Sequence, residues 1–176
     1  RQDNGEPLEE WGAEFLGYFT DDLSLYGRHS RTEQGDLALE QTQLTGDWRI
    51  GTDGQFGAEL RRVSEENYDA SVDALLAALS YRHRLNDRWE LYGVGQVTLD
   101  DDGGAYRKND LATLGARYLF GDRSSVGAEV SSGSRGDGGK VEAEYRLAPD
   151  HTLYGNYSYT TDRTSTDPLF DTGLQS

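Results

Sequence analysis

The sequence contains no cysteine, which limits both its covalent architecture and its chemistry. Without cysteine the chain has neither a disulfide framework nor a thiolate metal site. It also lacks any run that approaches the ~20 apolar residues a membrane-spanning helix needs, and hydrophobic residues make up only 35% of the chain. These absences exclude a disulfide-stapled domain, a cysteine-ligated metal site and a helical membrane protein.

Basic residues are scarce relative to acidic ones. The 176 residues include 17 Lys and Arg against 32 Asp and Glu, which gives a formal net charge of −15. Phosphate groups are attracted by Lys and Arg, so this balance argues against a nucleic-acid partner. A disordered acidic protein has a similar charge, but three Trp, eleven Tyr and five Phe argue for a folded domain.

Methionine is absent as well, even at position 1, and no charged-then-apolar targeting segment opens the chain. We therefore expect a processed product or part of a longer protein. We divide the sequence into an N-terminal tail or linker over residues 1–9, a β domain over residues 10–161 and a loop-like tail over residues 162–176.

What the sequence does contain is a regular series of short turns, spaced 28 to 35 residues apart. Their central residues are Asp21, Thr52, Asp87, Asp122 and Asp150. Longer polar stretches, rich in Gly or Asp, separate them near residues 32–36, 65–71, 100–109, 132–139 and 162–170. Short turns at one end and long loops at the other are typical of an up-and-down antiparallel sheet.

This spacing predicts ten strands, over residues 10–20, 23–31, 37–50, 55–65, 72–85, 89–99, 111–120, 125–133, 140–147 and 152–161. Segment 64–85 is ambiguous, because its Leu- and Ala-rich centre also fits a helix that begins near Asn67 or Asp69. We interpret it as a strand because its apolar residues alternate and the hairpin spacing requires a strand there.

Side chains alternate between an apolar and a charged face along these strands. In segment 111–120, for example, Ala112, Leu114 and Ala116 share one face, whereas Thr113 and Arg117 share the other. The apolar face is rich in Ala and Gly, which would make a thin core for a soluble protein but suits contact with lipid chains. The alternative is a soluble sandwich or barrel with one hydrated face.

Large aromatic residues on the apolar face lie within a few positions of the short turns. Trp and Tyr favour the headgroup level of a membrane, because one end of the ring is apolar and the other polar. We interpret this series as an interfacial aromatic girdle; its members are Phe19, Trp48, Phe56, Trp89 and Phe120.

The opposite face carries charges of both signs. In a narrow barrel they would pair and plug the interior, whereas in a wide barrel they would line water and bias the passage of ions. We predict that this set lines a lumen; it consists of Glu14, Arg28, Glu59, Arg61, Glu90, Arg117, Glu129, Glu142, Glu144 and Arg146.

Two short patterns repeat in the same register. Gly-Ala followed by a charge occurs at residues 12–14, 57–59, 115–117 and 127–129, and Leu-Tyr-Gly occurs at 25–27, 91–93 and 153–155. With these hairpin repeats the chain, from about residue 10 to 161, resembles the β-barrel domain of a Gram-negative outer-membrane protein. The resemblance implies an all-β, up-and-down transmembrane barrel in contact with outer-membrane lipid and lipopolysaccharide.

The end of the chain departs from that class, whose barrels typically finish with an amphipathic strand ending in Phe or Trp. Residues 166–176 are loop-like instead. We therefore expect the final strand or strands to be missing, so that further strands or subunits complete a wider barrel. An open sheet edge cannot persist in lipid.

No catalytic, metal or cofactor site is predicted. The only three histidines, His29, His83 and His151, lie on three hairpins and form no H-x-x-H or H-E-x-x-H spacing, and no G-x-S-x-G elbow is present. The sequence favours a non-enzymatic pore or transport channel. The alternative is a membrane-anchoring or export barrel of a larger surface protein; a barrel enzyme or a soluble β protein fits less well.

Overall fold

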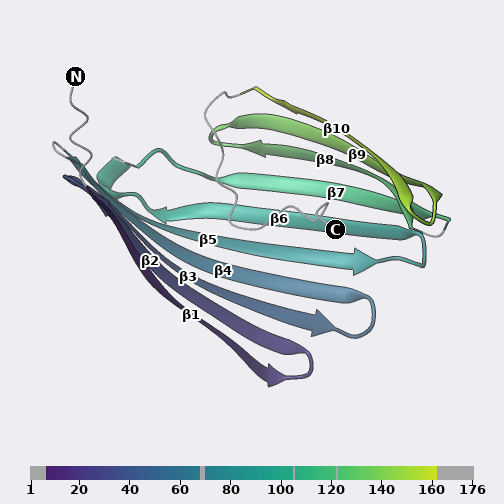
Figure 1. The fold of residues 1–176 in the computed structure, drawn as a ribbon, viewed down its shortest axis with the longest axis horizontal. Coiled ribbons are helices and arrows are strands. Elements are labelled where there is room, and N and C mark those ends of the chain that lie inside the picture. Colours follow the sequence, from purple (N-terminus) through teal and green to yellow (C-terminus); the bar gives the residue numbers. More distant parts are fainter. Residues whose placement is uncertain (1–6, 68–69, 105, 122, 162–176) are drawn as a thin grey trace.

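The computed structural model describes residues 7–67, 70–104, 106–121 and 123–161, and they form one antiparallel sheet in sequence order (Figure 1). The strands are β1 (Leu8–Thr20), β2 (Leu23–Gln34), β3 (Leu37–Ile50), β4 (Gly54–Asn67), β5 (Ala70–Arg84), β6 (Trp89–Asp100), β7 (Leu111–Phe120), β8 (Ser124–Gly133), β9 (Gly136–Ala148) and β10 (His151–Thr160). A single 3-10 turn, η1 (Asp102–Gly104), is the only other regular element among the described residues.

All ten predicted strands are confirmed. The described residues of segment 64–85 are not helical, since β5 pairs with β4 from Ala70 to His83. The short turns also form as expected; in one of them the Asn86 side chain accepts hydrogen bonds from the backbone N–H groups of Arg88 and Trp89, at 2.9 and 3.0 Å. The predicted tail over residues 162–176, and Asp122 in the fourth short turn, lie outside the described residues.

The predicted alternation of short turns with long loops is wrong at three places. β2 and β3 pair up to Gln34 and Leu37, β4 and β5 up to Asn67 and Ala70, and β8 and β9 up to Gly133 and Gly136. Only residues 101–110 form a long connection within the described part of the chain. Polar side chains do not interrupt a ladder whose backbone groups pair with one another, so these polar stretches extend the strands.

The sheet is curved and open. Figure 1 shows β1 and β10 at its opposite edges, and β8, β9 and β10 turn away from the plane of the first strands. Among the described residues β1 pairs only with β2, and β10 only with β9.

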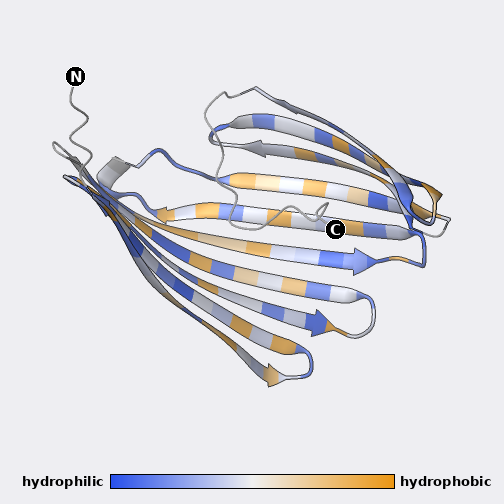
Figure 2. Cartoon of the chain, viewed as in Figure 1, coloured by the Kyte–Doolittle hydropathy of each residue, from blue (hydrophilic) through white to orange (hydrophobic). Residues whose placement is uncertain are grey.

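The register sorts the side chains into two faces, and Figure 2 shows apolar and polar residues alternating along the strands. We call the face that carries Arg28, Gln43 and Arg61, which lie opposite one another on β2, β3 and β4, the inner face. The opposite face, with Leu44 and Leu60, is the outer face.

The burial of the two faces is the reverse of that in a soluble protein. On the inner face Glu59, Arg61, Gln96 and Thr113 are 5, 8, 2 and 1% exposed. On the outer face large apolar side chains are exposed; examples are Phe15, Phe19, Leu44, Trp48, Leu60, Leu79, Leu114, Val130 and Tyr157. Water would penalise such a continuous apolar surface, whereas hydrocarbon would not.

Two aromatic rings occupy the space over glycines of neighbouring strands. A Cβ atom at Gly115 on β7 would overlap the ring of Tyr92 on β6, and one at Gly27 on β2 would overlap the ring of Phe15 on β1. The glycines thus supply the space for the rings, an arrangement that fixes strand register. At Tyr92 and Gly115 it brings one Leu-Tyr-Gly repeat and one Gly-Ala repeat together across neighbouring strands.

We expect Gly115→Ala to destabilise the fold by roughly 1–3 kcal/mol, because overpacking forces the Tyr92 ring out of place. The matched control is Gly95→Ala on β6, where an added Cβ meets nothing within 4 Å and the expected change stays within about 0.5 kcal/mol. Denaturant unfolding of the lipid- or detergent-folded protein, followed by tryptophan fluorescence, measures both. Equal effects of the two substitutions would contradict this role of Gly115.

Candidate functional site

The inner face is the candidate functional site, because the register brings all ten predicted charges to it. Glu14 on β1 lies opposite Arg28 on β2, and Glu90 on β6 lies opposite Arg117 on β7. That this face encloses water remains a prediction. What the structure adds is how the charges are partnered.

The most deeply buried charges form an ion pair on β4. The Arg61 Nη2 atom lies 2.8 Å from Glu59 Oε1, and Nε donates to the same oxygen at 3.0 Å. Their side chains are 9 and 1% exposed, respectively. A buried charge is costly unless it is paired and hydrogen-bonded, so each residue requires the other.

A second group of contacts crosses β5, β6, β7 and β8. The Tyr92 hydroxyl passes over Gly115 and donates to Glu129 Oε2 at 2.7 Å. Arg82 on β5 pairs with Glu90 at 3.4 Å, and its guanidinium lies 6.0 Å from the centre of the Tyr92 ring. These contacts connect the side chains of β5, β6 and β8, and they cross β7 at Gly115.

The charges on β7, β8 and β9 are partnered as well. Arg117 Nη2 donates to Ser125 Oγ at 3.1 Å and lies 4.0 Å from Glu144 Oε2, and Lys140 pairs with Glu142. Arg146 Nη2 donates to the carbonyl oxygen of Pro149 at 2.7 Å, in the β9–β10 turn. On β4 to β9 most of the predicted acidic side chains of the inner face are therefore paired with basic ones, and this face does not carry charge of a single sign.

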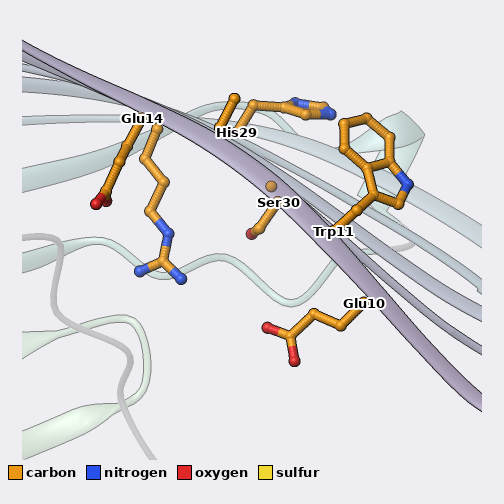
Figure 3. A pocket seen from close by; sticks show the side chains of 8 residues that line it. Glu10, Trp11, Glu14, His29 and Ser30 are labelled. Atoms are coloured by element: carbon orange, nitrogen blue, oxygen red, sulfur yellow. The ribbon is translucent and has the colours of Figure 1, made fainter.

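The inner face is more open at the β1 edge. A hollow there is lined by side chains of both faces, with Glu10, Glu14 and Ser30 on one side of the ribbon and Trp11 and His29 on the other (Figure 3). Glu14 accepts a hydrogen bond from the Tyr26 hydroxyl at 2.9 Å. The residues that line this hollow come from β1 and β2 and point to opposite sides of the sheet, so they do not converge on one point as catalytic groups would.

The five predicted girdle aromatics all lie on the outer face or at its margin. Trp48 and Phe56 are paired neighbours on β3 and β4, the Trp89 ring lies 4.9 Å from that of Tyr118, and Phe120 lies 6.3 Å from the ring of Tyr145. Clusters of this kind at the short-turn end are typical of a membrane interface. Their function as a girdle remains a prediction.

At the other end, the outer face changes from apolar to ionic. Arg31 pairs with Glu33 at 2.5 Å and with Glu40 at 3.4 Å, and Arg62 donates from Nε to Asp73 Oδ1 at 3.0 Å. Of these residues only Glu33 lies in a stretch predicted as a loop, 32–36, and the others lie in predicted strands near that end of the sheet. The ion pairs mark the limit of the apolar surface along β2, β3, β4 and β5.

Sequence reasoning missed several inner-face residues. Arg82 and Lys140 share the parity of the predicted set and were identifiable from alternation. The segment 106–110, which packs on the inner face through Tyr106, follows no strand pattern. The signal for it is β5, which is apolar on both faces although the inner face of the neighbouring strands is mainly polar.

The described residues contain no group of three or more His, Cys, Asp or Glu placed to hold a metal ion. The three histidines do not come together: His29 bonds Thr42, and His83 lies against Tyr81. No helix in the described part of the chain is both long and apolar enough to cross a membrane.

Comparison with solved structures identifies the fold. The outer-membrane expressed OmpT of Vibrio cholerae matches with a TM-score of 0.62 and 16% identity, over 86% of this chain and 54% of that one. This chain thus spans about half the length of that protein. The KdgM porin in complex with disordered oligogalacturonate matches with a TM-score of 0.51 and 12% identity, over 88% of this chain and 89% of that one. The all-β up-and-down sheet is that of outer-membrane β-barrels.

Comparison by sequence is more limited. The model of a family described as a protein of unknown function, DUF481, matches residues 29–135. No curated protein matches the chain.

We expect Glu59→Gln to cost on the order of 3 kcal/mol, because it leaves the buried Arg61 guanidinium without its carboxylate. The matched control is Glu14→Gln at the exposed β1 edge, where the expected loss is below about 1 kcal/mol. Denaturant unfolding of the folded, lipid- or detergent-bound protein measures both. A loss at Glu59 no larger than at Glu14 would contradict the buried-pair interpretation.

Proposed function

The chain belongs to DUF481, a family of unknown function, and we propose that it is part of an outer-membrane β-barrel whose inner face lines a pore or transport channel. The observation that carries this proposal is the reversed burial of the two faces. Charged and polar side chains are enclosed, while large apolar side chains cover the outside. Only an apolar solvent around the sheet and a polar interior within it satisfy both faces.

The pairing of the inner charges supports a defined interior. Because glutamates and arginines neutralise each other on β4 to β9, a passing ion meets local dipoles there. At the exposed β1–β2 edge, by contrast, Arg28 lies opposite Glu14 and is open to solvent. Charges that line a water-filled passage bias which ions cross it.

The open edges support a proposal about the partners of this sheet. In lipid the unpaired backbone groups of β1 and β10 require strands beside them, so we propose that further strands or subunits close the barrel. The short turns then face the periplasm, and the ionic ends of β2 to β5 face the lipopolysaccharide surface. Acidic side chains there, such as Glu33, Glu40 and Glu66, would attract divalent ions at that surface.

The assignment of the two faces is tested by introducing one charge on each. We expect Leu60→Arg on the outer face to destabilise the lipid-embedded protein by about 2–4 kcal/mol, because it places a cation in hydrocarbon. The matched control is Asn156→Arg at an exposed position on the inner face, opposite Glu142, with an expected effect below about 1 kcal/mol. Refolding into lipid vesicles, followed by heat-dependent gel migration, measures the difference. The reverse order of effects would refute the face assignment.

The channel itself is tested on the intact parent protein in planar bilayers. We expect discrete conductance steps, and we expect Arg28→Glu to shift the reversal potential in a salt gradient toward cation selectivity. The matched control is Arg88→Glu, which changes the same charge in a short turn at the end of the sheet and is expected to leave selectivity unchanged.

Absence of conductance from a correctly folded parent protein would contradict the channel. It would favour the second function considered from the sequence, a membrane-anchoring or export barrel. A selectivity shift of equal size with Arg88→Glu would show that the charges act from outside the passage.

A further inference from the structure

The inner face of β5 is apolar where the rest of that face is polar. Ala74, Leu76 and Ala78 are 1, 1 and 2% exposed and form the main apolar cluster of the described residues. The outer face of the same strand, with Leu75 and Leu79, is apolar too. One strand apolar on both faces must be covered on both, so something other than water covers the inner side.

The cover is the segment 106–110 of the β6–β7 connection. Tyr106 packs against the Ala74–Leu76–Ala78 cluster, next to Val63 of β4, and η1 contacts β5. The segment therefore folds inward over the inner face instead of standing away from the end of the sheet. The inner face is the proposed lining of the passage, so a segment packed on this face narrows the passage.

β6 fixes one side of the segment. Gln96 Nε2 donates to the carbonyl oxygen of Asn109 at 2.7 Å, and the Asn109 N–H donates to Thr98 Oγ1 at 2.8 Å. The Thr98 N–H in turn donates to Asp110 Oδ1 at 2.7 Å. Gln96 and Thr98 belong to β6, so these hydrogen bonds fix Asn109 and Asp110 to that strand.

The β8–β9 turn fixes the other side, mainly through Arg135. Its Nη2 donates to the carbonyl oxygen of Arg107 at 2.7 Å, its Nε donates to that of Lys108 at 3.2 Å, and its guanidinium lies 5.4 Å from the centre of the Tyr106 ring. Ser134 Oγ donates to the Lys108 carbonyl at 2.8 Å and accepts from the Asp110 N–H at 2.9 Å. A planar guanidinium can hold three consecutive residues in this way, whereas a lysine cannot.

We infer that Arg135 is a positioning residue that holds segment 106–110 against the inner face of β5, and that this segment sets the width of the passage. The inference rests on the proposed channel for its functional consequence, but the placement of the segment stands on its own contacts. Arg135 does not itself line the passage; it acts through Tyr106 and the two carbonyl groups that it binds.

The placement is tested first, on the intact parent protein in detergent micelles, with no need for a channel. Trypsin cleaves after Arg107 and Lys108 only when the segment can leave the sheet. We expect Arg135→Ala to speed cleavage there on the order of ten-fold, because it loses the hydrogen bonds to the Arg107 and Lys108 carbonyl groups and the contact with the Tyr106 ring. Arg135→Lys, which keeps the charge, is expected to lie close to Arg135→Ala. Cleavage at the same rate in all three proteins would overturn the inference.

The cover over β5 is tested with a single cysteine, which is possible because the chain has none of its own. With Ala74→Cys, a water-soluble maleimide is expected to react slowly, and on the order of ten-fold faster after Tyr106→Ala or Arg135→Ala. Tyr106→Phe retains the ring and is expected to keep the protection, and Arg88→Ala is the control for loss of an arginine. Rapid labelling of Ala74→Cys with Tyr106 and Arg135 intact would overturn the inference.

Conductance then separates this inference from the proposed function. We expect Arg135→Ala and Tyr106→Ala to raise single-channel conductance roughly two-fold by widening the passage, and Arg88→Ala to leave it unchanged. Unchanged conductance together with lost protection would refute the width-setting role while leaving the channel intact. If no variant conducts, the proposed function fails, and the protease and labelling results still decide the placement of the segment.

Discussion

The structure depends on one constraint, which is that the buried charged and polar side chains of the inner face need polar partners within the protein. The outer face is apolar along most of its length, and a strand sends every second side chain to the opposite face, so about half of the side chains lie on the polar inner face. Glu59 with Arg61, Arg82 with Glu90 and Tyr92 with Glu129 satisfy this requirement in pairs. The apolar contribution of a normal core is small here, because only a few apolar side chains are buried. Cross-strand polar contacts and the backbone ladder carry the organisation of the sheet.

Alternation predicted most of this fold from sequence, because its period fixes which side chains share a face. All ten charges assigned to one side, from Glu14 to Arg146, follow that parity in the observed register. Even the ambiguous β5 is a strand, since pairing with β4 and β6 overrides the weak strand preference of Leu and Ala. The same two-residue period makes the result sensitive, because a slip of one residue would exchange the faces. The rings of Tyr92 and Phe15 over glycines oppose such a slip.

Other features could not be predicted, for physical reasons. Polar composition near residues 32–36 and 132–139 indicates contact with water. A strand in contact with water can keep its backbone hydrogen bonds to the neighbouring strand, as these segments do. Composition therefore could not separate a loop from a strand extension. The inward fold of segment 106–110 depends on Arg135, 25 or more residues further along the chain, and no local period records a contact of that range. The sequence indicates this fold only indirectly, because β5 is apolar on both faces and its inner face therefore requires a cover.

The uneven lengths of neighbouring strands give the sheet a stepped rim. β4 and β5 continue to Asn67 and Ala70, whereas β6 ends at Asp100, opposite Leu75, and β7 begins only at Leu111. Five further residues at about 3.3 Å each raise the tall side by roughly 16 Å. The rim at this end of the sheet is therefore high along β4 and β5 and low along β6 and β7, so the inner face is more accessible from the side of β6 and β7.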